Sequence, residues 1–370
     1  MNGTIVSYLG ELSGLSFNWL GTLVIFFVAS LILASIMALI GGLGTYAERK
    51  ISADIQMRYG PNRVGPFGIL QFLADGVKML LKEDCIPRES DKFIFKLAPV
   101  LCFVGVLASL AVLPMSSGFI LSDLNVGIFY LLGVTSMVGV GIFLGGYSSN
   151  SKWAMLGGMR GASQIISYEV PVTLTILSIV MIAGGLSLNT LVGGQGPYPT
   201  DWYLFHNPFS FIGFFIYFIG SLAETNRAPF DLPEAESELV SGYHTEFSGM
   251  RYAFFALSEY IEVFVLCAIA AALFLGGYHV PFHLGGDGFV AQLLQLAVFF
   301  AKSFFLYYIV IWIRWTLPRM RVDHLMVLCW KYLTPIALFN LVGTAIWMYC
   351  FNGRSFYLIV KHFFVLSGHQ

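Results

Sequence analysis

The chain has 370 residues, of which 57% are hydrophobic and only 11% charged, and its formal net charge is −1. Soluble domains carry about a quarter charged residues, so this composition excludes an ordinary water-soluble fold. Apolar runs recur along the whole chain with no hydrophilic block large enough for a second domain, which predicts a single integral membrane domain over residues 1–370.

Eight apolar runs are candidates to cross the hydrocarbon core, which takes about 17 to 25 residues of helix. Because a bilayer offers no hydrogen-bond partners to the backbone, such spans must be helices. The sequence therefore predicts an all-α, polytopic membrane bundle of about eight transmembrane helices. The spans are expected at residues 22–44, 96–113, 124–145, 162–184, 208–223, 253–276, 291–313 and 335–351.

The loop between the first two spans contains a helical pattern of its own. After the turn signal GPNRVGP at residues 60–66, apolar residues alternate with Asp75, Lys78 and Lys82 at helical period. This pattern predicts an amphipathic helix that lies along the membrane surface.

Basic residues are strongly segregated between the loops. Of the 20 Lys and Arg residues, 17 lie in the odd-numbered loops or at their edges, and the even-numbered loops contain none. The positive-inside rule therefore places the odd-numbered loops in the cytoplasm.

Four positions put ionisable groups inside expected spans, where they mark functional sites by default. Glu169 lies about seven residues inside the fourth span, or roughly 10 Å deep. The sixth span is too short unless it includes Glu259 and Glu262, which share one helix face. Lys302 lies near the centre of the seventh span.

An acidic segment follows the fifth span. Because this span is short for a bilayer, Glu224 at its end is expected at or inside the membrane boundary. Residues 224–249 hold six acids against a single arginine, Arg227. Glu234 and Glu238 are expected one helical turn apart, so like-charge repulsion should raise some of their pKa values. This arrangement indicates a proton relay, with a solvated acidic loop as the alternative. The remaining acids are Asp231, Glu236 and Glu246.

Electron-carrying sites are disfavoured by the cysteines and histidines. The five cysteines show no CxxC spacing, so neither an iron-sulfur cluster nor a zinc site is indicated. The seven histidines fall in loops or in the tail, which argues against paired intramembrane haem ligands. The tail from Ser355 to Leu366 is either a second surface helix or a ninth apolar segment.

Several long strings closely resemble the quinone-site membrane subunit of NADH-quinone oxidoreductase (respiratory complex I), called the H subunit in bacteria and subunit 1 in mitochondria. They are AERKISADIQMRYGPNRVGPFG from Ala47, FLADGVKMLLKED, ISYEVP around Glu169, ETNRAPFDLPEAESELVSGYHTEFSGM from Glu224, and FAKSFFLYYIVIWIRWTLPRMRVDHLM from Phe300. They occur in the family's order and cover nearly the whole chain.

The resemblance implies two groups of site residues. A chamber for the quinone head group would be lined by Glu48, Arg49, Arg58, Asp75, Lys78 and Phe230, with Arg314 as a further candidate. An acidic funnel toward the pumping part of the membrane arm would contain Glu169, Glu224, Glu234, Glu236, Glu238, Glu246, Glu259 and Glu262, with Lys302 as a further station.

The resemblance also implies the partners and the location of the chain. Quinone is expected as substrate, whereas NADH, FMN and iron-sulfur clusters belong to other subunits, and no metal is expected here. The partners would be the hydrophilic quinone-module subunits, the pumping subunits of the membrane arm and the lipid bilayer, without nucleic acid. The bacterial inner (plasma) membrane is the expected location, with the mitochondrial inner membrane as the alternative.

On this interpretation the chain belongs to a proton-translocating NADH:quinone reductase but carries no redox centre itself. Two alternatives remain at this point: the related membrane subunit of an energy-converting hydrogenase, and a stand-alone proton-coupled secondary transporter, because intramembrane acids also mark ion coupling. An inverted repeat, which is typical of such transporters, is not evident in the sequence.

Overall fold

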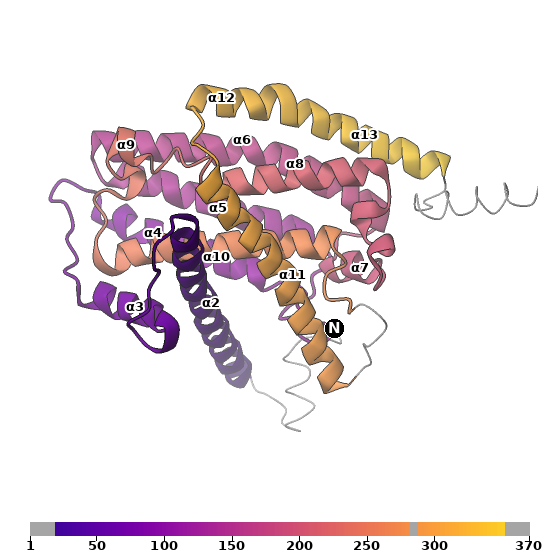
Figure 1. Ribbon diagram of the computed structural model, residues 1–370, viewed down its shortest axis with the longest axis horizontal. Coiled ribbons are helices and arrows are strands. Elements are labelled where there is room, and N and C mark those ends of the chain that lie inside the picture. Colours follow the sequence, from indigo (N-terminus) through magenta and orange to yellow (C-terminus); the bar gives the residue numbers. More distant parts are fainter. Residues whose placement is uncertain (1–18, 281–287, 352–370) are drawn as a thin grey trace, which may run out of the picture.

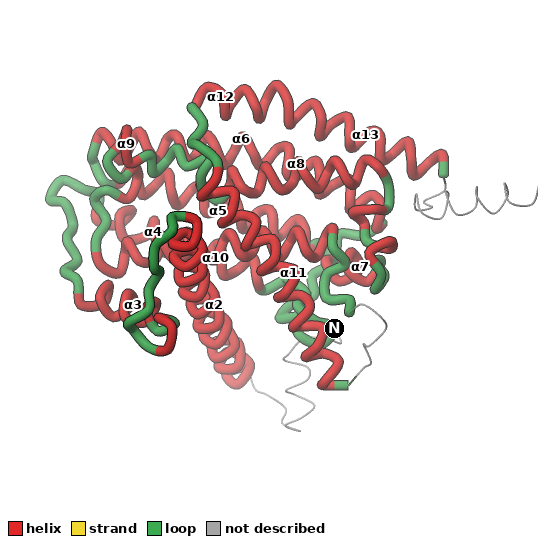
Figure 2. The backbone as a smooth tube through the Cα atoms, in the orientation of Figure 1, coloured by secondary structure: helices red, strands yellow, loops and turns green. Residues whose placement is uncertain are grey.

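The computed structural model describes residues 19–280 and 288–351, apart from the side chains of residues 19–23, 25, 26, 236 and 237. Within these ranges the regular structure is entirely helical (Figure 2). Seven of the described helices are long and apolar enough to cross a membrane, and α8 is a further apolar helix of shorter length. The predicted all-α membrane bundle is confirmed; the tail at residues 355–366 lies outside the described residues.

The helices follow one another along the chain with short connecting elements. The long ones are α2 (Trp19–Ile55), α4 (Lys92–Leu110), α5 (Gly127–Ser148), α6 (Lys152–Ala183), α8 (Pro208–Glu224), α10 (Gly249–Phe274), α11 (Phe289–Thr316) and α13 (Thr334–Cys350). The short ones are η1 (Pro66–Gly68), α3 (Gln71–Leu81), α7 (Leu188–Gly193), η2 (Pro199–Asp201), η3 (Tyr203–Phe205), α9 (Glu236–Leu239), η4 (Gly242–His244), α12 (Val322–Val327) and η6 (Leu328–Leu333).

Two helices extend well beyond their expected spans. The helix α2 continues to Ile55 rather than ending at residue 44, and α6 begins at Lys152 rather than at residue 162. Apolar composition marks the part of a helix that meets hydrocarbon, whereas the hydrogen-bonded helix itself can continue into the polar region. The expected boundaries were therefore wrong at these ends.

The last span was also predicted to begin too late, at residue 335. Helical structure runs from Val322 through the π-helical turn η6 into α13, so Lys331 lies in a helix rather than in a loop. Pro335 has no N–H to donate, which disturbs the regular backbone pattern. The Thr334 hydroxyl donates to the Cys329 backbone carbonyl at 2.9 Å and so gives this carbonyl a hydrogen-bond partner next to the proline.

The helix α10 is the centre of the bundle. It contacts α2, α3, α4, α8 and α11, and every residue from Ile261 to Phe274 is buried. A helix that is apolar on all sides belongs in the core. In Figure 1, α6, α8 and α10 run along the long axis of the molecule, whereas α2 and α11 cross it obliquely.

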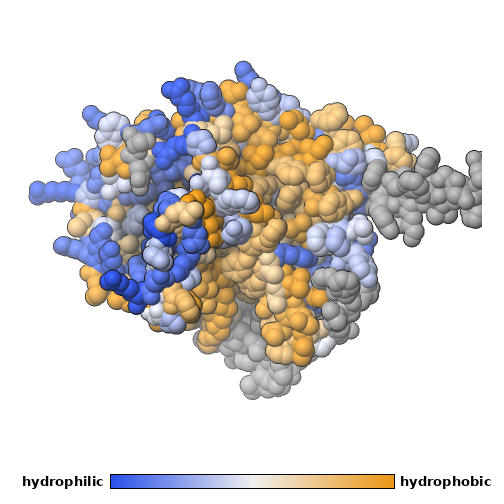
Figure 3. Space-filling model, viewed as in Figure 1, coloured by the Kyte–Doolittle hydropathy of each residue, from blue (hydrophilic) through white to orange (hydrophobic). Residues whose placement is uncertain are grey.

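Hydrophilic residues gather at one end of the molecule. In Figure 3 this end is the one that carries α3, α9 and the loop between α2 and α4, while a broad apolar surface covers much of the rest of this face. The predicted helix in the first loop is confirmed as α3, which contacts α2 and α10. Leu73, Val77 and Leu80 on α3 are each more than half exposed, as expected for a helix at a membrane surface.

Candidate functional site

Two arginines share one buried carboxylate in a cluster next to α10, in which Arg227 is buried and Arg314 is half-buried. Glu48 on α2 is 5% exposed. Its Oε2 accepts from Arg227 Nη1 at 2.9 Å, and its Oε1 lies 2.5 Å from Arg314 Nη1 on α11. The cluster joins α2, α11 and the segment after α8, and it carries one net positive charge when all three groups are ionised. We call Glu48, Arg227 and Arg314 the buried arginine cluster.

The position of Arg227 is fixed by the packing of the chain around it. Its guanidinium lies 4.0 Å from the centre of the Tyr260 ring on α10, which is a cation–π geometry. The segment that carries it is anchored by Gln164 on α6, whose Nε2 donates to the carbonyls of Ala223 at 2.7 Å and Phe230 at 2.9 Å. Gln164 thus holds both ends of this turn, and Arg227 is directed toward Glu48.

A polar cavity of about 200 Å³ adjoins the buried arginine cluster. It is lined by Arg227, Glu234, Tyr243, His244, Tyr252, Phe255, Ala256, Glu259, Tyr260 and Arg314. The Tyr243 hydroxyl donates to Glu259 Oε1 at 2.6 Å, and the His244 Nδ1 lies 3.7 Å from Glu234 Oε1. The cavity therefore brings two carboxylates of the acidic segment and α10 together beside two guanidinium groups.

Burial dominates the electrostatics of the acidic segment. Burial, and then the neighbouring Glu259, raise the pKa of the Glu234 carboxyl well above its ordinary value. Burial also raises the pKa of Asp231, although the Arg319 guanidinium at 2.9 Å acts in the opposite direction. Both acids therefore favour the protonated form more than an exposed carboxyl does.

A series of carboxylates continues from this cavity into the bundle. Glu234 interacts electrostatically with Glu259, Glu262 interacts with Glu259 and Glu224, and Glu224 interacts with Glu169. Glu262 and Glu224 are 5% and 7% exposed, whereas Glu169 is half-buried. We call these five residues the acid chain: it passes from the acidic segment through α10 and the end of α8 to α6.

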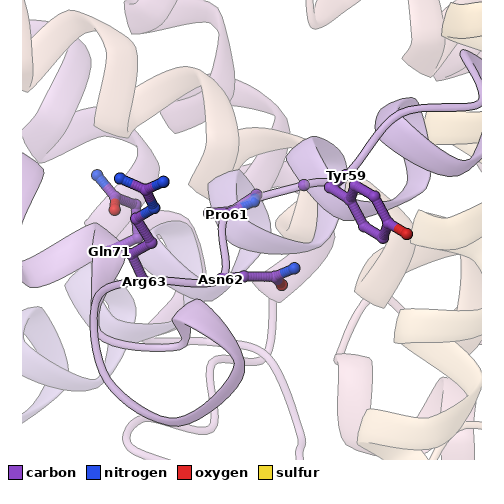
Figure 4. A pocket seen from close by; sticks show the side chains of 6 residues that line it. Tyr59, Pro61, Asn62, Arg63 and Gln71 are labelled. Atoms are coloured by element: carbon purple, nitrogen blue, oxygen red, sulfur yellow. The ribbon is translucent and has the colours of Figure 1, made fainter.

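A second ion pair lies between α2 and α3. Arg49 Nη1 contacts Asp75 Oδ2 at 2.6 Å, and Gln71 Nε2 donates to the other carboxylate oxygen of Asp75 at 3.1 Å. Gln71 also lines an open hollow of about 420 Å³ together with Tyr59, Gly60, Pro61, Asn62 and Arg63. In Figure 4 the Tyr59 side chain points away from those of Arg63 and Gln71. The GPNRVGP loop thus forms one wall of a hollow that adjoins this pair.

The other expected chamber residues, Phe230, Arg58 and Lys78, differ in their surroundings. Phe230 is buried, with its ring centre 5.9 Å from that of Tyr168. Arg58 is exposed and donates from Nε to Gln56 Oε1 at 2.7 Å. Lys78 is exposed on α3. Within the described residues, neither Arg58 nor Lys78 forms an ion pair with the other chamber candidates.

Glu234 and Glu238 are not one helical turn apart, contrary to the prediction from the sequence. Glu234 precedes α9 and Glu238 lies within it, so they are not on successive turns of one helix, and that prediction was wrong. Glu238 instead pairs with Arg160 on α6 at 2.7 Å, with its side chain 53% exposed. The partner that acts on Glu234 is Glu259 on α10. Glu246 is half-buried near the start of α10, and the side chain of Glu236 lies outside the described part.

Lys302 lies away from the acid chain. Its Nζ donates to the carbonyls of Leu275, Gly277 and His279 at 2.7, 2.9 and 3.3 Å, and it lies 4.8 Å from the centre of the Trp202 ring. These carbonyls follow the C-terminus of α10, where a cation is electrostatically favoured. Leu275 is 13 residues beyond Glu262, which corresponds to about 20 Å along a helix.

Sequence reasoning missed the roles of Arg227, Tyr243, Tyr260 and Gln164. Arg227 could have been found, because a single arginine in an acidic segment is the natural counterion of a nearby buried acid. Tyr243, Tyr260 and Gln164 carry no such signal, since tyrosine and glutamine are common packing residues. Within the described ranges, no group of three or more His, Cys, Asp or Glu side chains could hold a metal ion.

Comparison with known proteins gives one consistent result. The NADH dehydrogenase family profile matches residues 27–345. The H subunit of NADH-quinone oxidoreductase from Chlorobaculum parvum is 48% identical over 350 residues, which covers 91% of this chain and 96% of the relative. The corresponding proteins of Anaeromyxobacter dehalogenans and Bacillus thuringiensis are 47% and 45% identical, covering 86% and 89% of this chain and 81% and 95% of the relatives.

Proposed function

The chain belongs to the family of the H subunit of NADH-quinone oxidoreductase, and from this premise we propose that it forms the membrane side of the quinone site and couples quinone reduction to proton translocation. The observation that carries the proposal is the acid chain, a series of electrostatically interacting carboxylates that starts at the polar cavity beside the buried arginine cluster. Buried carboxylates within a membrane protein are costly and mark proton or ion pathways. Here a series of carboxylates, of which Glu262 and Glu224 are buried, extends from Glu234 to Glu169 through the most buried helix of the bundle.

The quinone head group would meet the polar end of the bundle near α2 and α3. The hollow beside the GPNRVGP loop has a volume of about 420 Å³, within the roughly 300–1,000 Å³ of small-molecule sites. Arg49 and Asp75 supply polar groups next to it, Arg58 lies exposed just before the GPNRVGP loop, and Lys78 lies exposed on α3. The head group needs such donors and acceptors, while its apolar tail remains in lipid.

The buried arginine cluster would connect the chamber to the acid chain. Its net positive charge lies on the wall of the cavity that also holds Glu234 and Glu259. A change of charge in the chamber would alter the electrostatic balance of this cluster, and through it the protonation of the first acids. Because neighbouring carboxylates titrate as a set, the change would pass to Glu262, Glu224 and Glu169.

The remaining chemistry would be supplied by partner subunits. We propose that hydrophilic subunits carrying flavin and iron-sulfur clusters deliver electrons to the quinone, and that membrane-arm subunits receive the signal at the Glu169 end. This chain would bind and orient the head group and move protons or charge. The bilayer would be the bacterial inner membrane, because the relatives compared above are bacterial.

The test is a Glu262→Gln variant of the intact complex in reconstituted vesicles. The amide keeps the shape of the side chain but removes a charge from the middle of the acid chain. We expect a loss of at least tenfold in both NADH:quinone turnover and proton translocation, with assembly and NADH oxidation by an artificial acceptor retained. Glu89→Gln is the matched control, because Glu89 is exposed in the connection between α3 and α4.

Normal turnover and normal proton translocation in the Glu262→Gln complex would contradict the role of the acid chain. If the carboxylate only holds helices together, the amide should instead lower the yield of assembled complex and leave the protons moved per NADH unchanged in the complex that does form.

A further inference from the structure

A second polar region lies between α6, α8 and α13, apart from the acid chain. Asn340 and Thr344 lie one turn apart on α13, and both are buried. On α8, Gly213 lies next to Asn340, and both Ser210 and Asn207, which directly precedes the helix, are buried. We call Asn340, Thr344, Gly213, Ser210, Asn207 and the nearby Ser178 of α6 the polar seam.

The amide of Asn340 is the central feature of the polar seam. It is 1% exposed, and neither Nδ2 nor Oδ1 has a hydrogen-bond partner among the described residues. A Cβ atom on Gly213 would lie 2.9 Å from Nδ2 and 3.9 Å from the Ser178 hydroxyl oxygen. Glycine at position 213 thus leaves the amide room beside the backbone of α8.

The neighbouring hydroxyl groups retain accepting capacity. Ser178 donates its proton to the Thr175 carbonyl at 2.6 Å, and Thr344 donates to the Leu341 carbonyl at 2.7 Å. Each hydroxyl oxygen can still accept a hydrogen bond, because its own proton is directed along its own helix. The Ser178 hydroxyl oxygen and the Asn340 amide thus both lie close to Gly213 without a hydrogen bond between them.

The end of the polar seam near the start of α8 shows the same lack of partners. Asn207 Nδ2 and His206 Nδ1 are buried and have no hydrogen-bond partner in the described part of the chain. Gly213 is six residues from Asn207, or about 9 Å along α8. Unpartnered buried polar atoms thus occur both at Asn340 and at the start of α8.

We propose that ordered water molecules occupy the polar seam and hydrogen-bond the Asn340 amide. A buried amide in the hydrocarbon region requires partners, and water is the smallest molecule that both donates and accepts. The seam residues Asn340, Ser178, Thr344 and Ser210 are uncharged, so they do not favour a bound ion over water. The water would bridge α13 to α6 and α8.

This hydrated site would be separate from the acid chain. Between them, Gly220 of α8 packs closely on α6, because a Cβ atom there would lie 2.4 Å from Val172 Cγ2 and 3.9 Å from the Tyr168 carbonyl oxygen. Glu224 is 11 residues from Gly213, or about 16 Å along α8. This close contact lies between the two polar regions along α8.

The first test is a map of the intact complex at a resolution that shows water. We expect density about 3 Å from both amide atoms of Asn340. Direct hydrogen bonds from both amide atoms to protein groups, with no density in the polar seam, would overturn the proposal.

The second test uses radiolytic hydroxyl-radical labelling, which modifies side chains next to bound water. Phe209, whose ring lies beside Gly343 of α13, is the reporter. We expect Asn340→Leu to lower Phe209 modification several-fold. Val342→Leu is the matched control, because Val342 is 56% exposed on the outer side of α13, and it should leave the labelling unchanged. Equal Phe209 labelling in wild type and Asn340→Leu would refute the bound water.

Discussion

The buried arginine cluster gives a sharp prediction for Glu48→Gln. In the wild type both carboxylate oxygens contact arginines, at 2.9 Å and 2.5 Å. The glutamine keeps the size of the side chain but presents an NH₂ group to one of the two guanidinium groups. The change therefore replaces one favourable contact by a donor–donor contact and leaves two neighbouring positive charges without their shared anion.

The expected cost follows from the burial of the cluster. The side chains of Glu48 and Arg227 are 7% and 6% exposed, and removing one partner of such a buried pair costs about 3–5 kcal/mol. Each kcal/mol of lost unfolding free energy lowers the thermal midpoint by about 1–2 °C in a chain of this size, when the values for smaller domains are scaled to its length. We expect the thermal midpoint of the subunit in the intact complex to fall by about 3–10 °C.

Glu238→Gln is the matched control for this measurement. Glu238 also contacts an arginine, at 2.7 Å, but its side chain is 53% exposed. Exposed ion pairs contribute about 0–1 kcal/mol to the free energy of unfolding, so the thermal midpoint of Glu238→Gln should fall by no more than about 2 °C. Equal midpoints for Glu48→Gln and Glu238→Gln would refute the argument that burial makes the arginine cluster a structural anchor.

Three further predictions concern the chamber, pH dependence and topology. Asp75→Leu should lower NADH:quinone turnover about tenfold or more by releasing Arg49, whereas oxidation of NADH by an artificial acceptor should be unchanged; equal loss with both acceptors would indicate misassembly. The pKa of the Glu234 carboxyl in the folded state is raised above its ordinary value of 4.5. The protonated carboxyl therefore contributes its full stability below pH 4.5, and this contribution is lost as the pH rises through the folded-state pKa. Thermal midpoints of wild type and Glu234→Gln should therefore diverge with rising pH, and parallel curves would exclude a raised pKa. Reporter fusions at Gln195 should face the outside and those at Gly242 the cytoplasm, so a cytoplasmic signal at Gln195 would contradict the charge-based topology.

Much of the fold could be predicted from the sequence because bilayer thickness and backbone hydrogen bonding leave few choices. The expected span at 208–223 differs from α8 by one residue, since Asn207 and Pro208 provide a clear start signal. The end of α2 and the start of α6 were missed because helices that leave the hydrocarbon lose their apolar signature while keeping their hydrogen bonds. Pro335 was taken as a boundary, but the π-helical turn accommodates it.

The individual acids could be found, but their pairing could not. The cost of charge in a membrane singles out Glu169, Glu259 and Glu262 from the sequence alone. Which acid faces which depends on contacts between segments far apart in sequence. Glu48 and Arg227 are separated by 179 positions, and no local periodicity records such a contact. The same holds for Glu234, whose partner proved to be Glu259 rather than Glu238.

The proposed coupling requires that the acid chain respond to a charge change in the chamber, and the buried arginine cluster lies on the cavity that holds the first two of its acids. Two unit charges about 10 Å apart interact by about 1.7 kcal/mol at an effective dielectric constant of about 20, which equals slightly more than one pKa unit. An exposed carboxyl titrates too far below neutral pH for such a shift to alter its protonation there. Glu234 differs, because burial and Glu259 already hold its pKa well above the ordinary value. In the proposed mechanism, a charge that appears in the chamber would therefore act on an acid whose pKa burial and Glu259 have already raised, a condition that an exposed glutamate does not meet.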